Sequence, residues 1–390
     1  MNISPRMRLP LSLAALLLCA GCVTRERKVS APEPFVFRAL DLQHQEPNGK
    51  PAWQLRSPEA RYDTVRQLAQ ARQPRGTVFR RGKPHITIQA QRGTVIGDGQ
   101  AIQLEGDVLI TLLGKEPVRI SGDQARWIPS KELMVIDRRP AALDRRSRLT
   151  AQEAHYFLAR DLVELRGEPT LEQWEKAGRQ RASAAPLRVR TEQVDWRPDQ
   201  GDLNAPKPVR GVRRQKDSNL TLAASGLRGN LRQGYVDLLA PVQVRDSKRQ
   251  GWLNAQQTRW AFNDALLSSN LPFEGQMKKL KLRGQAFTVN LEQSDVAVQG
   301  DCQLQQPGEQ LQAQQCFWNW PSGRFQAQGA VELRRATYKQ ITRASVLNGQ
   351  IGKEGTAVFR APGSKVTSQF TLPRAQKGAP AKRKAAPVVF

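Results

Sequence analysis

The chain has few of the residues that usually build catalytic or metal sites. Its 390 residues include only three histidines, His44, His85 and His155, which lie far apart in the sequence, and four cysteines. HExxH, GxSxG and P-loop patterns are absent, and Gly97-Asp98-Gly99 lacks the third glycine of a dinucleotide-binding fingerprint. The sequence therefore predicts a protein that is not an enzyme and has neither a metal site nor a cofactor.

Long hydrophobic runs are also scarce. One short run, Leu9 to Ala20, follows two arginines and ends at small residues. These features are typical of a secretory signal, and the run is too short to span a bilayer. Cys19-Ala20-Gly21-Cys22 resembles a bacterial lipobox, in which the last cysteine is lipidated and begins the mature chain. We therefore expect a signal peptide over residues 1–21 and a lipid on Cys22, with an unlipidated, ordinary signal peptide as the alternative.

Two cysteines remain for the body of the chain, Cys302 and Cys316. An even number of cysteines in an oxidising compartment favours a disulfide. The pair flanks a segment that is typical of a hairpin, and pairing of its strands about residue 309 would place the cysteines opposite each other. Two buried free thiols are the alternative.

Acidic residues are outnumbered, with 35 Asp and Glu against 61 Lys and Arg, and the formal net charge is +26. Such a charge indicates an anionic partner. For an exported chain, anionic lipid or a membrane surface fits better than nucleic acid. Part of the charge also simply keeps outward strand faces soluble.

One β-pattern recurs about ten times and dominates the chain. Apolar or small residues stand at positions 0, +2, +5 and +7 of each copy, as in Leu149-Ala151-Ala154-Tyr156 and Leu253-Ala255-Thr258-Trp260. Copies starting at 55, 88, 120 and 149 return 133 or 134 residues later, at 189, 222, 253 and 282. Such regular self-similarity predicts stacked supersecondary units and a duplicated module.

The spacing within the pattern predicts a corner. Positions 0 and +2 lie on one face of a strand, and in an unbroken strand positions +5 and +7 would lie on the opposite face. Apolar residues at all four positions therefore indicate a bulge, or a point where the chain passes between two sheets. A second ribbon, from Ala101 to Ile110, keeps its apolar residues on one face around Gly106, and a mid-strand glycine also suggests a bulge or bend.

The boundaries of the modules follow from where the pattern is interrupted. The stretch Glu172 to Pro186 is polar and separates repeats more widely than elsewhere. We expect a tether over residues 22–34, one module over residues 35–175, a second over residues 187–372, and a basic disordered tail over residues 373–390.

A segment that runs from Phe35-Val36-Phe37 through Asn48-Gly49 and Trp53-Gln54-Leu55 to Ser57-Pro58-Glu59-Ala60-Arg61-Tyr62 resembles the start of LptC, a periplasmic lipopolysaccharide-export protein. Ribbons such as Leu104-Glu105-Gly106-Asp107-Val108 are similar to repeats shared by LptC, LptA and OstA-like domains. The resemblance covers residues 35–345. It implies a twisted, open β-jellyroll with an apolar groove for acyl chains, joined edge to edge with other jellyrolls. Two departures are the apparent duplication and the lipid anchor, since family members commonly have one jellyroll and many have a transmembrane helix.

From this resemblance we expect a periplasmic protein, lipid-anchored at the inner membrane. It would accept lipopolysaccharide from an inner-membrane ABC exporter and pass it toward the outer membrane. Partner jellyrolls would dock on sheet edges near Trp53–Tyr62 and Thr356–Leu372. The expected groove residues are Ile102, Leu104, Val108, Ile110, Trp127, Tyr156, Trp196, Trp260 and Trp318.

Two alternatives remain open at this point. The same side chains would also fill a sealed core between two sheets without contacting any lipid. In that case the protein would be a structural envelope lipoprotein or a jellyroll adaptor that binds anionic polymer without carrying lipid.

Overall fold

The computed structural model describes residues 35–114, 117–143, 147–174, 187–214, 219–248, 250–350 and 357–371. All 34 strands in these ranges belong to one hydrogen-bonded antiparallel sheet, which confirms the all-β prediction. The expected signal peptide, the lipidation site Cys22, the tether and the basic tail lie outside the described residues.

Helical structure in the described ranges is limited to three short 3₁₀ turns. None of them is long or apolar enough to cross a membrane. They are η1 (Gly97–Gly99), η2 (Pro129–Lys131) and η3 (Thr337–Lys339).

The strands form two ladders that share eight long strands. The shared strands pass from one ladder into the other and lie at the two ends of the molecule: β1 (Phe35–Gln45), β2 (Pro51–Asp63), β7 (Ala101–Leu112), β8 (Val118–Ile128), β29 (Asp295–Gln306), β30 (Glu309–Asn319), β31 (Arg324–Arg335) and β32 (Gln340–Gln350).

Ladder one is completed by β3 (Leu68–Arg72), β6 (Arg92–Ile96), β9 (Leu133–Arg138), β12 (Glu153–Phe157), β13 (Leu162–Arg166), β16 (Gln193–Arg197), β17 (Asp202–Ala205), β20 (Gly226–Asn230), β21 (Tyr235–Leu239), β24 (Thr258–Ala261), β25 (Leu266–Ser269), β28 (Ala286–Asn290) and β33 (Ala357–Arg360).

Ladder two is completed by β4 (Arg75–Arg80), β5 (Lys83–Gln89), β10 (Ala141–Leu143), β11 (Ser147–Thr150), β14 (Thr170–Gln173), β15 (Leu187–Arg190), β18 (Val209–Arg214), β19 (Asn219–Ala224), β22 (Val242–Asp246), β23 (Gly251–Ala255), β26 (Phe273–Met277), β27 (Leu280–Gly284) and β34 (Thr367–Gln369).

The recurring sequence pattern marks the corners between the ladders. In one copy, Leu253 and Ala255 belong to β23 of ladder two, whereas Thr258 and Trp260 belong to β24 of ladder one. The predicted corner is therefore confirmed. We call the line of corners along the molecule the seam, and the two rows of hairpin turns that lie away from it the rims.

Glycines make four of the return corners, from ladder one to ladder two. Gly106, Gly167, Gly300 and Gly329 all have positive φ, between 68° and 76°. Each lies against a glutamine of a neighbouring corner, and a Cβ added at Gly167 would lie 2.5 Å from Cβ of Gln152. These positions therefore exclude any side chain both through their backbone conformation and through their contacts.

Apolar side chains from the inner faces of both ladders form one continuous core. Ladder pairing also continues across the stretch where the sequence predicts a module boundary. β14 pairs with β15, and β13 pairs with β16, on either side of residues 175–186. The division into two modules stays a prediction, because the ladders themselves do not stop there.

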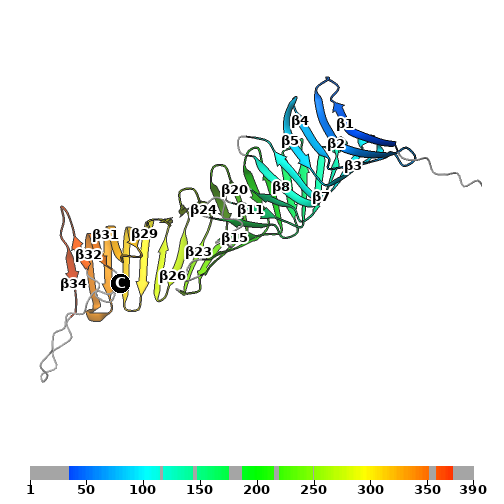
Figure 1. Cartoon of the computed structure of the whole chain (residues 1–390). Coiled ribbons are helices and arrows are strands. Elements are labelled where there is room, and N and C mark those ends of the chain that lie inside the picture. Colours follow the sequence, from blue (N-terminus) through cyan, green and yellow to red (C-terminus); the bar gives the residue numbers. More distant parts are fainter. Residues whose placement is uncertain are drawn as a thin grey trace, which may run out of the picture.

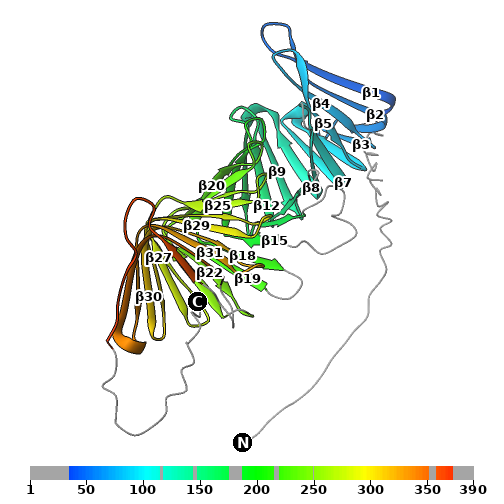
Figure 2. The same cartoon turned by 90° about the vertical axis from the view of Figure 1, so that its left-hand side faces the viewer.

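Figures 1 and 2 show an elongated, twisted molecule, with β1 at one end of the described chain and β34 at the other. In Figure 2 the strands of the C-terminal half spread out like a fan. Each ladder has about twenty strands, and ~4.8 Å per strand gives a sheet on the order of 100 Å long.

A disulfide joins Cys302 and Cys316, with their Cα atoms 6.1 Å apart. The expected pairing about residue 309 is wrong, because Cys302 pairs with Ala313 and Cys316 with Val298. The strands pair about the Pro307-Gly308 turn instead, and the bulge at Gly300-Asp301 shifts the register. Cys302 thus lies in the ladder-two half of β29 and Cys316 in the ladder-one half of β30, so the disulfide links the two ladders.

Gly167→Ala is expected to destabilise the fold by about 1–3 kcal/mol, because alanine is disfavoured at positive φ and would clash with Gln152. The matched control is Gly114→Ala, since Gly114 has ordinary φ and nothing within 4 Å of an added Cβ. Urea unfolding followed by circular dichroism measures the difference. Equal midpoints for the two variants would contradict the importance of the glycine corners.

Candidate functional site: an apolar trough between two ladders

The inner faces of the two ladders enclose a space that we call the trough, bounded by the seam and by the rims. All nine residues expected to form a groove project from these inner faces. Seven of them are buried: Ile102, Leu104, Val108, Ile110, Trp127, Tyr156 and Trp196. Trp260 and Trp318 are only partly buried and pack against the same core.

The trough is tightly filled in its N-terminal part. Ile86, Ile102, Leu104, Ile110 and Met134 are each at most 1% exposed. The indole of Trp127 packs edge-on against that of Trp53, with ring centroids 5.5 Å apart. Large side chains from both ladders thus contact one another directly here, as in an ordinary sandwich core.

A small apolar cavity lies farther along, between β11 and β20. It encloses about 60 Å³. Leu149, Leu171 and Val189 line it from ladder two, and Trp196, Leu203 and Leu227 line it from ladder one. The two inner faces leave this small space unfilled between them.

Between β19 and β30 several inner apolar side chains are incompletely covered. A second, smaller cavity of about 20 Å³ lies among Leu280, Leu282, Val296 and Trp318. Of the partly exposed inner residues, the sequence alone singled out only Trp260 and Trp318, although the recurring pattern contains several others. The full set is Leu222, Leu253, Trp260, Phe262, Leu267, Leu280, Leu282, Val289, Val296 and Trp318.

Small residues occupy inner positions in both halves of the trough. Gly275, Gly284 and Thr258 are buried in the C-terminal half, and Gly122 and Ala125 are buried in β8 of the N-terminal half. The size of the inner side chains therefore does not by itself explain the incomplete cover between β19 and β30.

Polar side chains meet at the rims beside Tyr156. The Tyr156 hydroxyl donates a hydrogen bond to Asp161 at 3.2 Å, and the backbone N–H of Asp199 donates to the same carboxylate at 2.7 Å. Arg80 of ladder two forms an ion pair with Asp199 of ladder one at 2.9 Å. Burial raises the pKa of Tyr156 and also that of Asp161. This cluster closes the rims over the tightly filled part of the trough.

Residues 20–139 match a family model described as lipopolysaccharide-assembly, LptC-related. We call this N-terminal part the LptC-related part, after the family to which it is similar. No curated protein matches the chain. The match associates the chain with lipopolysaccharide assembly and with the cell envelope, and LptC-related proteins are not known as enzymes.

The LptC-related part ends in a sheet edge, although not at the expected strand. Trp53–Tyr62 lies in β2, which is covered by β1, so β1 is the edge strand and the expectation is wrong at this end. β1 lies outside the recurring pattern, and its Phe35, Val36 and Phe37 are 45–60% exposed, so the pattern did not identify it as the edge. At the other end, β33 and β34 each pair with β32 alone among the described residues, as expected for an edge.

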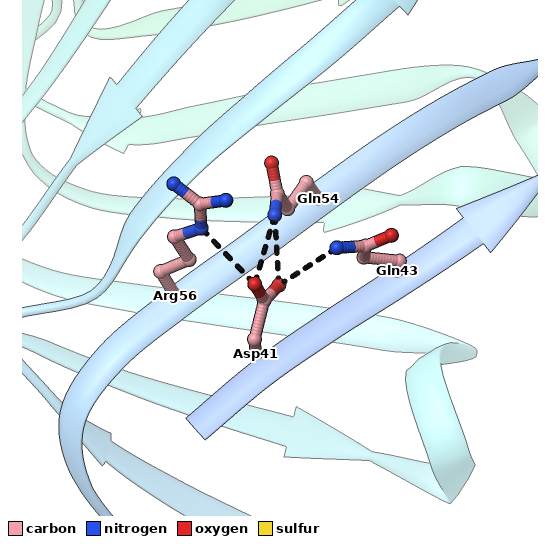
Figure 3. A network of polar contacts seen from close by, with 4 residues as sticks. All are labelled: Asp41, Gln43, Gln54 and Arg56. Carbon is pink, nitrogen blue, oxygen red and sulfur yellow. Dashed lines mark hydrogen bonds and ion pairs between the residues drawn. The ribbon is translucent and has the colours of Figure 1, made fainter. Parts of the chain in front are cut away.

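Polar contacts hold β1 onto its neighbour. The Asp41 carboxylate accepts hydrogen bonds from Gln54, at 2.8 Å, and from Gln43, and it pairs with Arg56 at 3.2 Å (Figure 3). The hydrogen bond from Gln54 contributes most to holding the pKa of Asp41 below its ordinary value. The edge strand of the LptC-related part is thus secured by side chains as well as by its backbone ladder.

Tyr156→Phe is expected to lower stability by about 1 kcal/mol, because it removes a buried hydrogen bond to Asp161 and leaves the packing of the ring unchanged. Tyr235→Phe is the control, since the Tyr235 ring stacks under Arg259 and this contact needs no hydroxyl. Thermal unfolding of both variants compares them. If Tyr235→Phe lowers Tm as much as Tyr156→Phe does, a specific role for the Tyr156 hydroxyl is contradicted.

Proposed function

We propose that this protein carries lipopolysaccharide through the periplasm by binding its acyl chains in the trough. It would be anchored through Cys22 at the inner membrane, accept lipopolysaccharide from an ABC exporter there, and pass it toward the outer membrane. The observation that carries the proposal is the set of inner apolar side chains that remain partly exposed between β19 and β30.

Acyl chains suit such a surface for a simple physical reason. Burying apolar surface is favourable by roughly 25 cal/mol per Å², and the direction of the chain along the trough matters little to that energy. A lipid could therefore advance past successive strands without any chemical step in this protein. The exporter would supply the driving force.

The charge of the chain agrees with an anionic lipid. The formal net charge is +26, and the inner positions that face the trough are mainly apolar. Basic side chains on outer faces and rims would then contact the anionic head group, while the acyl chains lie inside.

The length of the ladders bears on how many proteins are needed to carry lipid from the inner toward the outer membrane. A sheet on the order of 100 Å would let one chain cover a distance that elsewhere requires LptC together with LptA. The two predicted modules would then act as a permanently joined pair, without an edge-to-edge contact between them.

An adaptor without lipid is the second candidate function, and one observation favours it. Ile102, Leu104, Val108 and Ile110 are each 1% exposed, so the N-terminal trough has no room for an acyl chain unless the ladders separate. The two functions differ in whether lipid contacts the inner face, which can be measured directly.

A photoreactive residue in place of Leu282 is expected to form lipopolysaccharide adducts in cells, because Leu282 faces the trough and is partly exposed. The matched control is its neighbour Lys281, which is exposed on the outer face of the same strand. Trp260 provides a second inner site on ladder one. Absence of adducts at both inner sites, in folded and abundant protein, would favour the adaptor.

Partner jellyrolls would add strands to the edges formed by β1 at one end and by β33 and β34 at the other. Phe37→Asp is expected to reduce copurification of the inner-membrane exporter several-fold, because it puts a charge on the exposed edge. Val65→Asp is the control, as Val65 is 72% exposed but lies in the turn between β2 and β3. Equal losses in both variants would argue against docking at β1.

A further inference from the structure

The tertiary structure brings together three metal-ligating side chains that are far apart in the sequence. The ligand atoms of His85, Asp161 and Asp199 all lie within 4.8 Å of one another. His85 comes from β5 of ladder two, whereas Asp161 and Asp199 come from the hairpins β12–β13 and β16–β17 of ladder one. The group therefore spans the two rims.

The imidazole is aimed at the carboxylates by an irregularity in its strand. Val78 pairs with Ile86 and Phe79 pairs with Pro84, so His85 is the extra, unpaired residue of a β-bulge. A bulge frees a side chain from the in-and-out alternation of the strand and commonly redirects it toward a functional site. His85 thereby points to the rim and not to the outer face.

The Nε2 atom of His85 is fully buried and has no hydrogen-bond partner among the described residues. A buried nitrogen that lacks a partner is costly, and native structures rarely retain one without a reason. The acidic groups beside it are the carboxylates of Asp161 and Asp199, which accept hydrogen bonds when they are ionised. A cation would satisfy the nitrogen and both carboxylates together.

Surrounding groups orient the carboxylates as outer supports of a metal site usually do. Tyr156 and the backbone N–H of Asp199 donate to Asp161, and Arg80 pairs with Asp199. Arg80 already supplies one positive charge, so a metal ion would share Asp199 with it.

We propose that His85, Asp161 and Asp199 bind a divalent transition-metal ion of the zinc type, which fastens the two rims to each other. One imidazole nitrogen and two carboxylates are a ligand set that Zn²⁺ accepts, with water in the fourth position. A Zn²⁺ ion bound to each ligand atom at ~2.0–2.2 Å would tie His85 of ladder two to Asp161 and Asp199 of ladder one. This inference is independent of the proposed lipid transport.

The test uses the purified full-length chain, stripped of metal by a chelator and titrated with Zn²⁺. We expect one Zn²⁺ per chain by calorimetry and elemental analysis, and a rise in Tm of several degrees, with no comparable effect of Mg²⁺. His85→Ala and Asp199→Asn are each expected to weaken binding at least tenfold and to remove the rise in Tm.

His155→Ala is the matched control, because His155 contacts Glu153 at 2.6 Å, away from the three proposed ligands. It is expected to bind Zn²⁺ as the wild-type chain does. His85→Gln, which keeps a polar side chain at the bulge, replaces His85→Ala if circular dichroism shows that the alanine variant is unfolded. Absence of stoichiometric binding to the wild-type chain, or unchanged binding in the folded His85 variant, would overturn the proposal.

Discussion

The whole structure depends on the burial of two apolar faces against each other. Either ladder alone would expose one apolar face to water along its entire length, and no helix in the described residues covers it. The chain solves this by turning a corner after each pair of short strands, so that neighbouring segments contribute to opposite faces. Hydrophobic burial at roughly 25 cal/mol per Å² then stabilises both ladders at once.

The same burial creates a tension between stability and any binding in the trough. Side chains such as Ile102 and Met134 fill the N-terminal part, so stability there leaves no free apolar surface. Between β19 and β30 several inner apolar side chains are only partly buried, so apolar surface is partly accessible there. The disulfide between Cys302 and Cys316 connects the two ladders covalently at the C-terminal end of this region.

The seam and the rims hold the ladders in different ways. At the seam the connection is covalent and regular, because the backbone itself passes between the ladders at each corner, and glycines with positive φ make four of these corners. At the rims it depends on side chains, and the ion pair between Arg80 and Asp199 joins residues 119 positions apart. The rims are thus the side on which the ladders can separate without breaking the chain's path.

The sequence by itself determined the strand class, the corners and the inward positions, because these depend on local alternation and its reversal. Leu253, Ala255, Thr258 and Trp260 show this directly, since their spacing alone predicts which two residues lie in each ladder. It also indicated that Cys302 and Cys316 stand near each other, although the bulge at Gly300-Asp301 altered their register.

Only the tertiary structure decided which strand forms the N-terminal edge, how completely each part of the trough is filled, and which polar groups meet at the rims. Asn48-Gly49 marks the turn between β1 and β2, but β1 lacks the recurring pattern, so that pattern does not show that β1 covers β2. His85, Asp161 and Asp199 lie in different repeats and meet through the twist of the sheet and a single bulge. Such contacts depend on the packing of distant strands, which residue spacing along the chain does not specify.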